Sequence, residues 1–474
     1  MKIRRHIIIT ISIIATCFAI SSCSVGKKYT RPDLNLPATF RDSTIILTAD
    51  SLTLPWQTFF KDTILIGHIQ TALERNKDVI IALKTVEQME LHYKQAKLNL
   101  LPILDLDVGA TRTWLSKNSL NGSLSEQFIG TPYMDDYTAT LRLSWEADIW
   151  GKAKMHKEGA LANYFRQKEN LSALKTRIIV QVAKAYYNLL ALDEQLSVAQ
   201  QNVTLADRTL EMIRVQYNSS LVTSVGLEQA VAQKKTAELL VPLAKQQIEI
   251  QENALSILCG YYPEKIERAG HLEDAMPDVL LATGVPAELI SRRSDVKASE
   301  YSLVSANANT GLAKAAMYPS FSLTPSIGTN SFKFNSWFDL PGSVIKTVGA
   351  NLTQPIFRKK SLRTAYEIAE IEQGKTAEQF KQVVLNAVGE VSDALATINY
   401  AQERLALISD KTNALKKATN DVILLYKNGM AMYLEVITAQ NNSLQNDLEA
   451  ISIQKNKLDA ITELYRALGG GTEE

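Results

Sequence analysis

The sequence predicts a mainly α-helical chain with a membrane β-barrel, built from a duplicated unit of strands followed by a long helical hairpin. Three observations predict this fold class. Short stretches alternate apolar and polar side chains, long segments without glycine or proline carry apolar residues at three- and four-residue intervals, and the same order of features occurs in both halves of the chain. The formal net charge of +1 gives no electrostatic reason to expect a nucleic-acid partner.

The first residues have the order of a secretory signal peptide. Lys2, Arg4 and Arg5 precede an almost wholly apolar run from Ile7 to Ile20. This run is about 14 residues long, short of the ~20 that a membrane-spanning helix needs. We therefore expect residues 1–22 to be a cleaved leader of an exported protein.

The end of this leader, Ile20-Ser21-Ser22-Cys23, resembles the lipobox at which bacterial lipoproteins are acylated on cysteine and then cleaved. Acylated Cys23 is then the first mature residue and the site of the only covalent lipid, with no other cofactor expected; each buried methylene contributes about 0.8 kcal/mol to anchoring. Ser24 follows, and lipoproteins without aspartate there usually reach the outer membrane. The alternatives are a plain leader with an incidental Cys23, or modification at Cys17. Cys259 is left without a disulfide partner and is expected to pack as a small apolar residue.

The first helical region predicts one very long helix. No glycine or proline occurs between Gly159 and Gly226, and an apolar seam with coiled-coil spacing runs over 182–217. A continuous helix over 152–217 would be ~100 Å long. Because such a helix projects beyond any compact domain, its partner must return beside it as an antiparallel hairpin.

The returning helix carries a second seam over 230–258, after a hairpin turn at 217–223. Pro242 lies inside it and is expected to kink or interrupt it. In the second half a similar seam begins at Val388, and Gly429 marks the corresponding hairpin tip.

The alternating stretches predict membrane strands. In "YTATLRLSWE" the residues Tyr137, Leu141 and Trp145 share an apolar face, whereas Arg142 and Ser144 lie on the polar face. A half-buried strand in a soluble sheet has the same pattern. The candidate strands lie near Ile103–Leu115, Tyr137–Ile149, Ser320–Thr329 and Val344–Thr353. Four strands cannot close a barrel, since the smallest membrane barrels need ~8, so we expect three chains to supply twelve strands.

No sequence pattern indicates an enzyme. The histidines lack metal-ligand spacing, so no metal or catalytic residue is assigned. Gly374-Lys375-Thr376 ends like a phosphate-binding loop, but Ala369 stands where that loop requires glycine. Asp135-Asp136 is expected in a turn or loop before a strand, and Arg292-Arg293 in a solvated, ion-paired linker.

Several segments resemble the outer-membrane efflux proteins, the TolC-like channel family, in the lipoprotein branch that serves resistance-nodulation-division pumps. They are "CSVGKKYTRPDLNLPATF" after the lipobox, "NALSILCGYYPE" at the end of the first half, and residues 284–324 with Arg-Arg-x-Asp-Val and an aromatic-Pro-Ser entry into a strand. Ser294 departs from the proline usual in the family. The expected organisation is a signal peptide (1–22), a lipidated segment (23–62) and two efflux repeats (63–270 and 271–474).

The resemblance implies a homotrimer: a twelve-stranded β-barrel in the outer membrane that continues into a twelve-helix α-barrel across the periplasm. It implies a passive exit duct for drugs and other toxic small molecules, with an inner-membrane efflux pump, a periplasmic adaptor protein and outer-membrane lipid as partners. Adaptor docking and the periplasmic gate are expected at the two hairpin tips. The residues assigned there are Tyr217, Ser220, Leu221, Leu425, Tyr426, Gly429, Met430 and Met432.

Many relatives close the tip with acidic residues and arginines near the second turn. Here no acid follows Gly429 until Glu435, so we expect a hydrophobic constriction by Leu425, Met430 and Met432. The alternative is that the methionines only pack between neighbouring hairpins. Two other functions stay open: a type I exit channel for secreted proteins, and a structural coiled-coil lipoprotein without a pore. The sequence does not name the cargo.

Overall fold

The computed structural model describes residues 25–40, 55–116, 118–121, 123, 131–277 and 292–471; Cys23 and the leader lie outside these ranges. The chain divides into two compact units. We call them the sheet unit (described residues up to 32, with 88–164 and 301–378) and the helical unit (33–87, 165–300 and 379–474). Each predicted repeat therefore contributes to both units.

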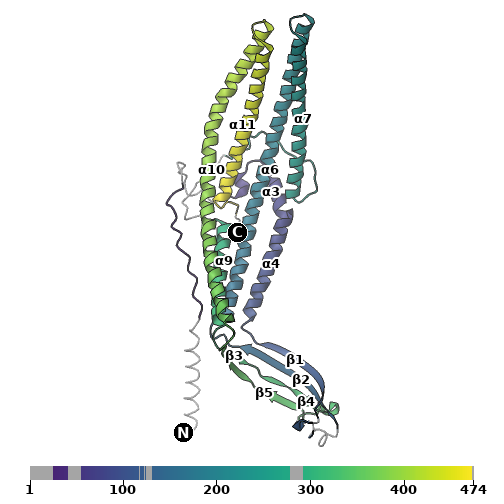
Figure 1. Ribbon diagram of the computed structural model, residues 1–474, viewed down its shortest axis with the longest axis vertical. Coiled ribbons are helices and arrows are strands. Elements are labelled where there is room, and N and C mark those ends of the chain that lie inside the picture. The colour runs from purple at the N-terminus through teal and green to yellow at the C-terminus, as the bar shows by residue number, and fades with distance from the viewer. Residues whose placement is uncertain are drawn as a thin grey trace. The chain divides into compact units, whose positions relative to one another are not determined.

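The elements follow one another in the order that the duplication predicts (Figure 1). They are α2 (Trp56–Phe59), α3 (Thr63–Arg75), α4 (Lys77–Leu98), β1 (Ile103–Trp114), β2 (Tyr133–Glu146), α6 (Lys152–Asn218), α7 (Ser224–Leu258), α9 (Ser294–Ala315), β3 (Ser320–Leu323), β4 (Ser326–Ser331), η3 (Phe334–Ser336), β5 (Val344–Thr347), β6 (Ala350–Thr353), α10 (Ser361–Lys427) and α11 (Tyr433–Ala467).

The long helices confirm the seam analysis. Helices α6 and α10 each contain 67 residues, and α7 and α11 each contain 35. Helix α7 continues through Pro242, so of the two expected effects the interruption is wrong, and the kink stays a prediction. Ala237 and Ala244 are buried on either side of the proline. Their packing holds the helix although Pro242 cannot donate a backbone hydrogen bond.

The sheet unit contains strands at all four predicted places, and they pair antiparallel. The third and fourth candidates are each broken, into β3 and β4 and into β5 and β6. The breaks face one another, because Thr324 N donates to Gly349 O at 2.8 Å, while Pro325 has no N–H and its carbonyl accepts from Leu143 N at 2.9 Å. Gly349 also leaves room for this contact, since a Cβ there would lie 2.7 Å from Thr324 Oγ1.

The sheet order is β5-β4-β2-β3-β6, with β1 paired to the other side of β2. Strand β2 begins at Tyr133, so Asp135 and Asp136 lie within it and their expected place in a turn or loop is wrong. Asp135 accepts two hydrogen bonds from Arg112 on β1, at 2.6 and 2.8 Å. This ion pair joins β1 to β2 at residues that precede the alternating segment beginning at Tyr137, so the two strands pair over more residues than the alternation predicts.

The helical unit has an aromatic and ionic core. Phe59 stacks on Tyr465 with ring centroids 4.2 Å apart. The carboxylate of Asp62 caps α3 at Ile64 N and also accepts from the buried Tyr186 hydroxyl at 2.5 Å. Cys259 is fully buried, which confirms its expected packing as a small apolar residue.

Arg293 is also part of this core, so the expectation of a solvated linker is wrong for it. Its side chain is only 4% exposed and pairs with Asp295 at 2.6 Å and Glu390 at 2.7 Å. It donates as well to the carbonyl of Ala467, at the end of α11. The buried cation thus joins the start of α9 to α10 and α11.

Candidate functional site: the hairpin tips and the exposed sheet

The two predicted tips form equivalent turns. The first joins α6 to α7 and the second joins α10 to α11. Leu221 N donates to Gln216 O at 2.9 Å, and Met430 N donates to Leu425 O at 2.8 Å. Ser220 and Gly429 occupy the same left-handed position, with φ of +58° and +73°. Both turns therefore have the hydrogen bonding of a helix C-cap with a left-handed residue.

The acid nearest the second turn has a structural role. Glu435 Oε2 accepts a hydrogen bond from Met432 N at 2.7 Å, which satisfies a backbone donor at the start of α11. At the first turn the residue three positions after the N-cap Thr223 is Gly226, which has no side chain to make this contact. Glu435 therefore acts in this chain as a helix cap.

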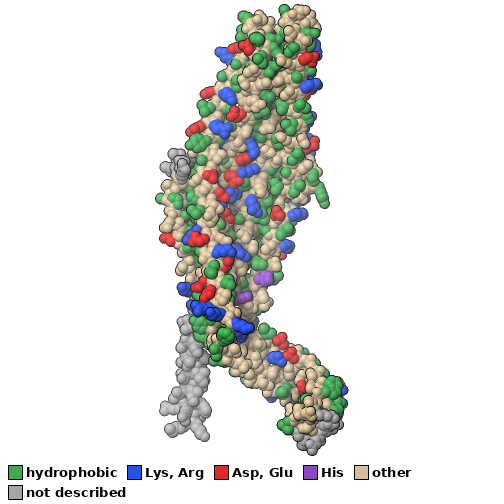
Figure 2. All heavy atoms as spheres, viewed as in Figure 1, with side chains coloured by type: hydrophobic (Ala, Val, Ile, Leu, Met, Phe, Trp, Pro, Cys, Tyr) green, Lys and Arg blue, Asp and Glu red, His purple; other side chains and the backbone are tan. Residues whose placement is uncertain are grey.

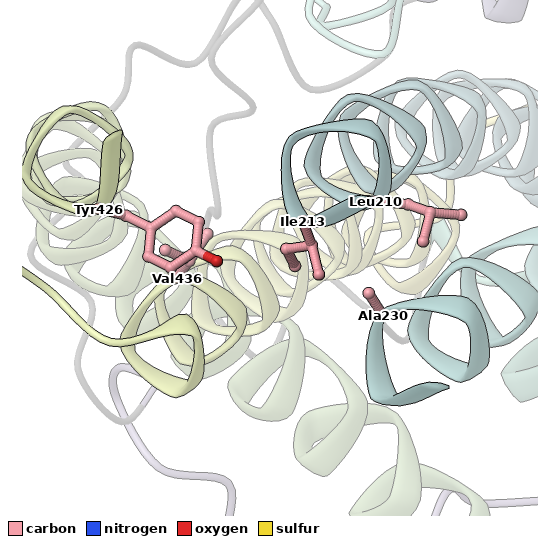
Figure 3. Close-up of a cluster of buried hydrophobic side chains, with 5 residues drawn as sticks. All are labelled: Leu210, Ile213, Ala230, Tyr426 and Val436. Atoms are coloured by element: carbon pink, nitrogen blue, oxygen red, sulfur yellow. The ribbon is translucent and has the colours of Figure 1, made fainter. Parts of the chain in front are cut away.

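A buried cluster packs the two hairpins together just behind the turns (Figure 3). Leu210, Ile213 and Ala230 come from the first hairpin, and Tyr426 and Val436 from the second. Tyr426 was expected to take part in docking and gating, but it is only 5% exposed. The structure thus places it inside one protomer, where it joins the hairpins.

Two tyrosine hydroxyls in this region are buried without a hydrogen-bond partner among the described residues, those of Tyr426 and Tyr433. Burial raises the pKa of Tyr426. Burial, with a smaller contribution from the neighbouring Tyr426, raises the pKa of Tyr433 to about 12. Both hydroxyls therefore stay neutral well above physiological pH, and each carries the cost of a buried polar group without a hydrogen bond in the described chain.

Hydrogen bonds donated by side-chain amides align the two hairpins further from the turns. Gln440 Nε2 donates to Thr209 Oγ1 at 2.9 Å, and both side chains are buried. Gln233 Nε2 donates to Asn441 Oδ1 at 2.8 Å. Because an unpaired buried amide is costly, these contacts favour one register between the hairpins.

The outer surface of the tips is apolar. Met430 and Met432 are 68% and 72% exposed, Leu221 is exposed to a similar degree, and Leu425 and Tyr217 less so. Further apolar residues near the turns are exposed and were not predicted as part of the site. They are Val215, Val225, Leu424 and Leu434. The sequence feature that could have identified them is an apolar residue at a helix position outside the apolar seam.

The sheet has one apolar and one polar face. The register places Leu106 opposite Leu141 and Leu141 opposite Ile327, all on one face. Thr138 lies opposite Gly109 and Asn330 on the other face. Arg142, with Asp107 at 3.3 Å, also lies on this polar face, as the alternation predicts.

The apolar face is uncovered and the sheet is open. On β1 all twelve residues are exposed, including Leu104, Leu106 and Val108. Among the described strands β1 pairs with β2 alone, and β5 and β6 are outermost on the other side. The described sheet therefore presents an apolar surface and unpaired backbone groups at both edges.

The described ranges contain no group of three or more His, Cys, Asp or Glu residues placed to hold a metal ion. None of the helices within those ranges is long and apolar enough to span a membrane.

The sequence model of the family described as outer membrane efflux protein matches residues 68–261 and 285–470. The chain belongs to this family. Its members are channel proteins of the outer membrane, not enzymes, and the outer membrane is where this chain belongs.

Among its relatives is the toluene efflux pump outer membrane protein TtgF of Pseudomonas putida, 28% identical over 471 residues that cover 97% of this chain and 96% of TtgF. The cation efflux system protein CusC of Escherichia coli is 27% identical over 463 residues, 96% of this chain and 97% of CusC. The open state of the Neisseria gonorrhoeae MtrE outer membrane channel superposes with a TM-score of 0.84 at 28% identity, over 95% of this chain and 98% of MtrE.

Proposed function

We propose that this efflux family member forms a homotrimeric exit duct, in which three sheets close a twelve-stranded β-barrel and the long helices form a twelve-helix α-barrel. The observation that carries the proposal is the open sheet with its exposed apolar face. In lipid, an open edge leaves backbone groups unpaired at several kcal/mol each. Edge-to-edge pairing with two further copies removes both edges.

The polar face of the sheet then lines the duct. Arg142, Asp107, Thr138 and Asn330 lie on this face, and the first two neutralise one another. Such a surface supports a water-filled lumen without strong selection by charge. The duct catalyses no reaction, and the energy for transport comes from the pump.

The mature chain is anchored through lipid on Cys23 in this proposal. The lipid supplements the barrel, because the exposed apolar strands supply a much larger membrane contact than two or three acyl chains. The described chain resumes two residues later, where Val25 N donates to Trp150 O at 3.3 Å.

The tips dock the periplasmic adaptor and close the duct. Docking through Tyr217, Ser220 and Leu221 in one turn and Gly429 in the other is supported by the equivalent turn geometry. The exposed Leu425, Met430 and Met432 support a constriction made by apolar side chains, since Glu435 is engaged as a helix cap. Tyr426 contributes indirectly, because its buried side chain packs the two hairpins together behind the turns.

The cargo is small molecules. TtgF is named for toluene efflux and CusC for cation efflux, and both are nearly equally identical to this chain, so overall similarity does not select between these cargo classes. A type I exit channel for proteins has the same fold and differs in its pump. A structural lipoprotein without a pore is disfavoured by the exposed sheet.

The test is purification in detergent followed by reconstitution into planar bilayers. Heat-modifiable trimers that conduct ions support the duct, and a folded monomer without conductance contradicts it. Deletion of the gene, followed by susceptibility tests with dyes, detergents, antibiotics and metals, then identifies the cargo. Unchanged susceptibility together with a missing secreted protein would favour type I secretion.

A further inference from the structure

The segment that joins β6 to α10 combines exposed apolar and exposed basic side chains. Ile356 and Phe357 are 95% and 81% exposed, and the exposed Arg358, Lys359 and Lys360 follow directly. We propose that residues 355–360, here called the basic junction, bind the anionic headgroups of phospholipids in the leaflet at the helix end of the strands. This inference rests on the membrane-spanning role proposed for the sheet.

The cations of the basic junction have no acidic partner among the described residues. The acids that line the pocket beside Arg358 are engaged elsewhere. Glu146 pairs with Lys152 at 3.1 Å. Asp148 accepts hydrogen bonds from Ala153 N at 2.9 Å and Lys154 N at 3.0 Å. The junction therefore keeps an uncompensated positive charge.

The equivalent junction of the first repeat shows that this charge is not required by the fold. There Asp148 caps α6, and a buried glycine, Gly151, takes the left-handed conformation with φ of +75°. Helix α10, like α6, has no acid in its first turn, and residues 356–360 before it contain no acid that could cap it as Asp148 caps α6. The left-handed residues of this second junction are Lys359 and Lys360, with φ of +49° and +62°, a conformation that favours glycine. Cations at a helix N-terminus are electrostatically unfavourable unless an anion binds there.

A pocket of about 230 Å³ lies beside Arg358 of the basic junction. Trp150, Tyr318, Pro355 and Arg358 are among its lining residues. Trp150 donates from Nε1 to the carbonyl of Pro319 at 2.6 Å, and its ring lies 4.8 Å from that of Tyr318. Aromatic rings with a polar edge are typical of membrane–water interfaces, where Arg358 meets a phosphate group.

The apolar side chains place the basic junction at the border of the lipid. Leu352 lies opposite Phe321 on the apolar face of the sheet and is exposed, four residues before Ile356. The exposed apolar surface therefore continues from the strand into the junction. Figure 2 shows Lys and Arg side chains gathered where the helices of the sheet unit meet the strands. A second copy of the chain is a poorer occupant, because it would bury cations that have no partner.

The experiment uses the full-length trimer reconstituted in phosphatidylcholine vesicles that contain increasing fractions of brominated phosphatidylglycerol. Bromine quenches tryptophan fluorescence, and Trp150 lines the pocket. Each cation near an anionic surface contributes about a fivefold preference. Three such factors multiply to about 125-fold, so we expect the triple variant R358Q/K359Q/K360Q to need about 100-fold more of the brominated lipid for equal quenching. About 0.5 M NaCl should weaken the wild-type preference, since it shortens the screening length.

The matched control is K245Q/K417Q/K427Q, which removes three exposed lysines from the helices of the helical unit and should quench as the wild type does. The variant K359G/K360G keeps the left-handed turn without the charges; it should form trimers and show the reduced preference. Equal quenching of the wild type and R358Q/K359Q/K360Q overturns the inference. Loss of the trimer in detergent by R358Q/K359Q/K360Q also overturns the inference, because it would show that the basic junction contacts a neighbouring copy of the chain. A wild-type chain that never inserts overturns the proposed function as well, whereas a conducting trimer without lipid preference overturns this inference alone.

Discussion

Replacement of Val108 by arginine tests which face of the sheet meets lipid. Val108 lies near the middle of β1, opposite Ala139 on the apolar face, and is 63% exposed. Thr138 lies one register step away, opposite Gly109 on the polar face. Val108→Arg and Thr138→Arg therefore introduce the same charge at nearly the same depth and differ in the face that carries it.

The expected difference follows from burial in hydrocarbon. Arginine on the lipid face of a membrane strand costs about 2–4 kcal/mol near the bilayer centre, and a lumen-facing position avoids this cost. One substitution should thus shift the folding equilibrium of each copy by roughly 30- to 1000-fold. In a trimer the three copies add to about 6–12 kcal/mol, comparable with the whole stability of a typical domain.

The assay is the fraction of chain recovered as heat-modifiable trimer after refolding into phosphatidylcholine vesicles. Val108→Arg should lose most of the trimer and Thr138→Arg should retain it, while Val108→Ala controls for the loss of the valine side chain. Equal losses in the two arginine variants, or a greater loss from Thr138→Arg, would refute the assignment of the faces.

Four further predictions concern the tips, the core and the anchor. Met430→Ser/Met432→Ser should raise single-channel conductance by widening an apolar constriction, whereas Leu239→Ser, an exposed site away from the turns, should not; unchanged conductance in the double variant contradicts the constriction. Because burial raises the pKa of Tyr433 to about 12, its unfolded state loses the proton first as pH rises above 10, so stability of the tip should fall between pH 10 and 12. Hydrogen exchange at the tip measures this fall, and Tyr433→Phe should reduce it. Arg293→Met should destabilise the trimer by about 1–3 kcal/mol, because it removes the buried cation that donates to the partly exposed carboxylates of Asp295 and Glu390, and Arg293→Lys by less. A thermal midpoint equal to that of the wild type would show that the pairs contribute nothing. Cys23→Ala behind a non-lipoprotein leader should still give trimers in outer-membrane fractions, and their complete loss would make the lipid essential for assembly.

Much of the fold could be predicted because its elements obey local periodicity. The seam over 182–217 predicted α6, and the alternation around Leu141 predicted β2 and the facing of Arg142. Helix α7 was harder, since local propensity argues for a break at Pro242, but packing of the seam on both sides outweighs it.

The positions of the two hairpin tips in the sequence were predicted, but the arrangement of their side chains was not. Gly429 marked the second turn and the break at 217–223 marked the first, and the structure shows Ser220 and Gly429 in the same left-handed conformation. Nothing local distinguishes the exposed Met430 from the buried Tyr426, since the difference depends on how the two hairpins lie against one another.

By itself, the sequence determined the elements and their repetition: helix and strand periods are read over a few neighbouring residues, and the duplication supplies each twice. Only the tertiary structure decided which polar groups are buried and paired. Arg293 forms an ion pair with Glu390, almost a hundred residues away, and Thr209 accepts a hydrogen bond from Gln440 in the other repeat. Such pairings form only when segments distant in the sequence pack together. From the sequence alone, the same polar side chains look like ordinary surface residues, because nothing local shows that folding removes them from water.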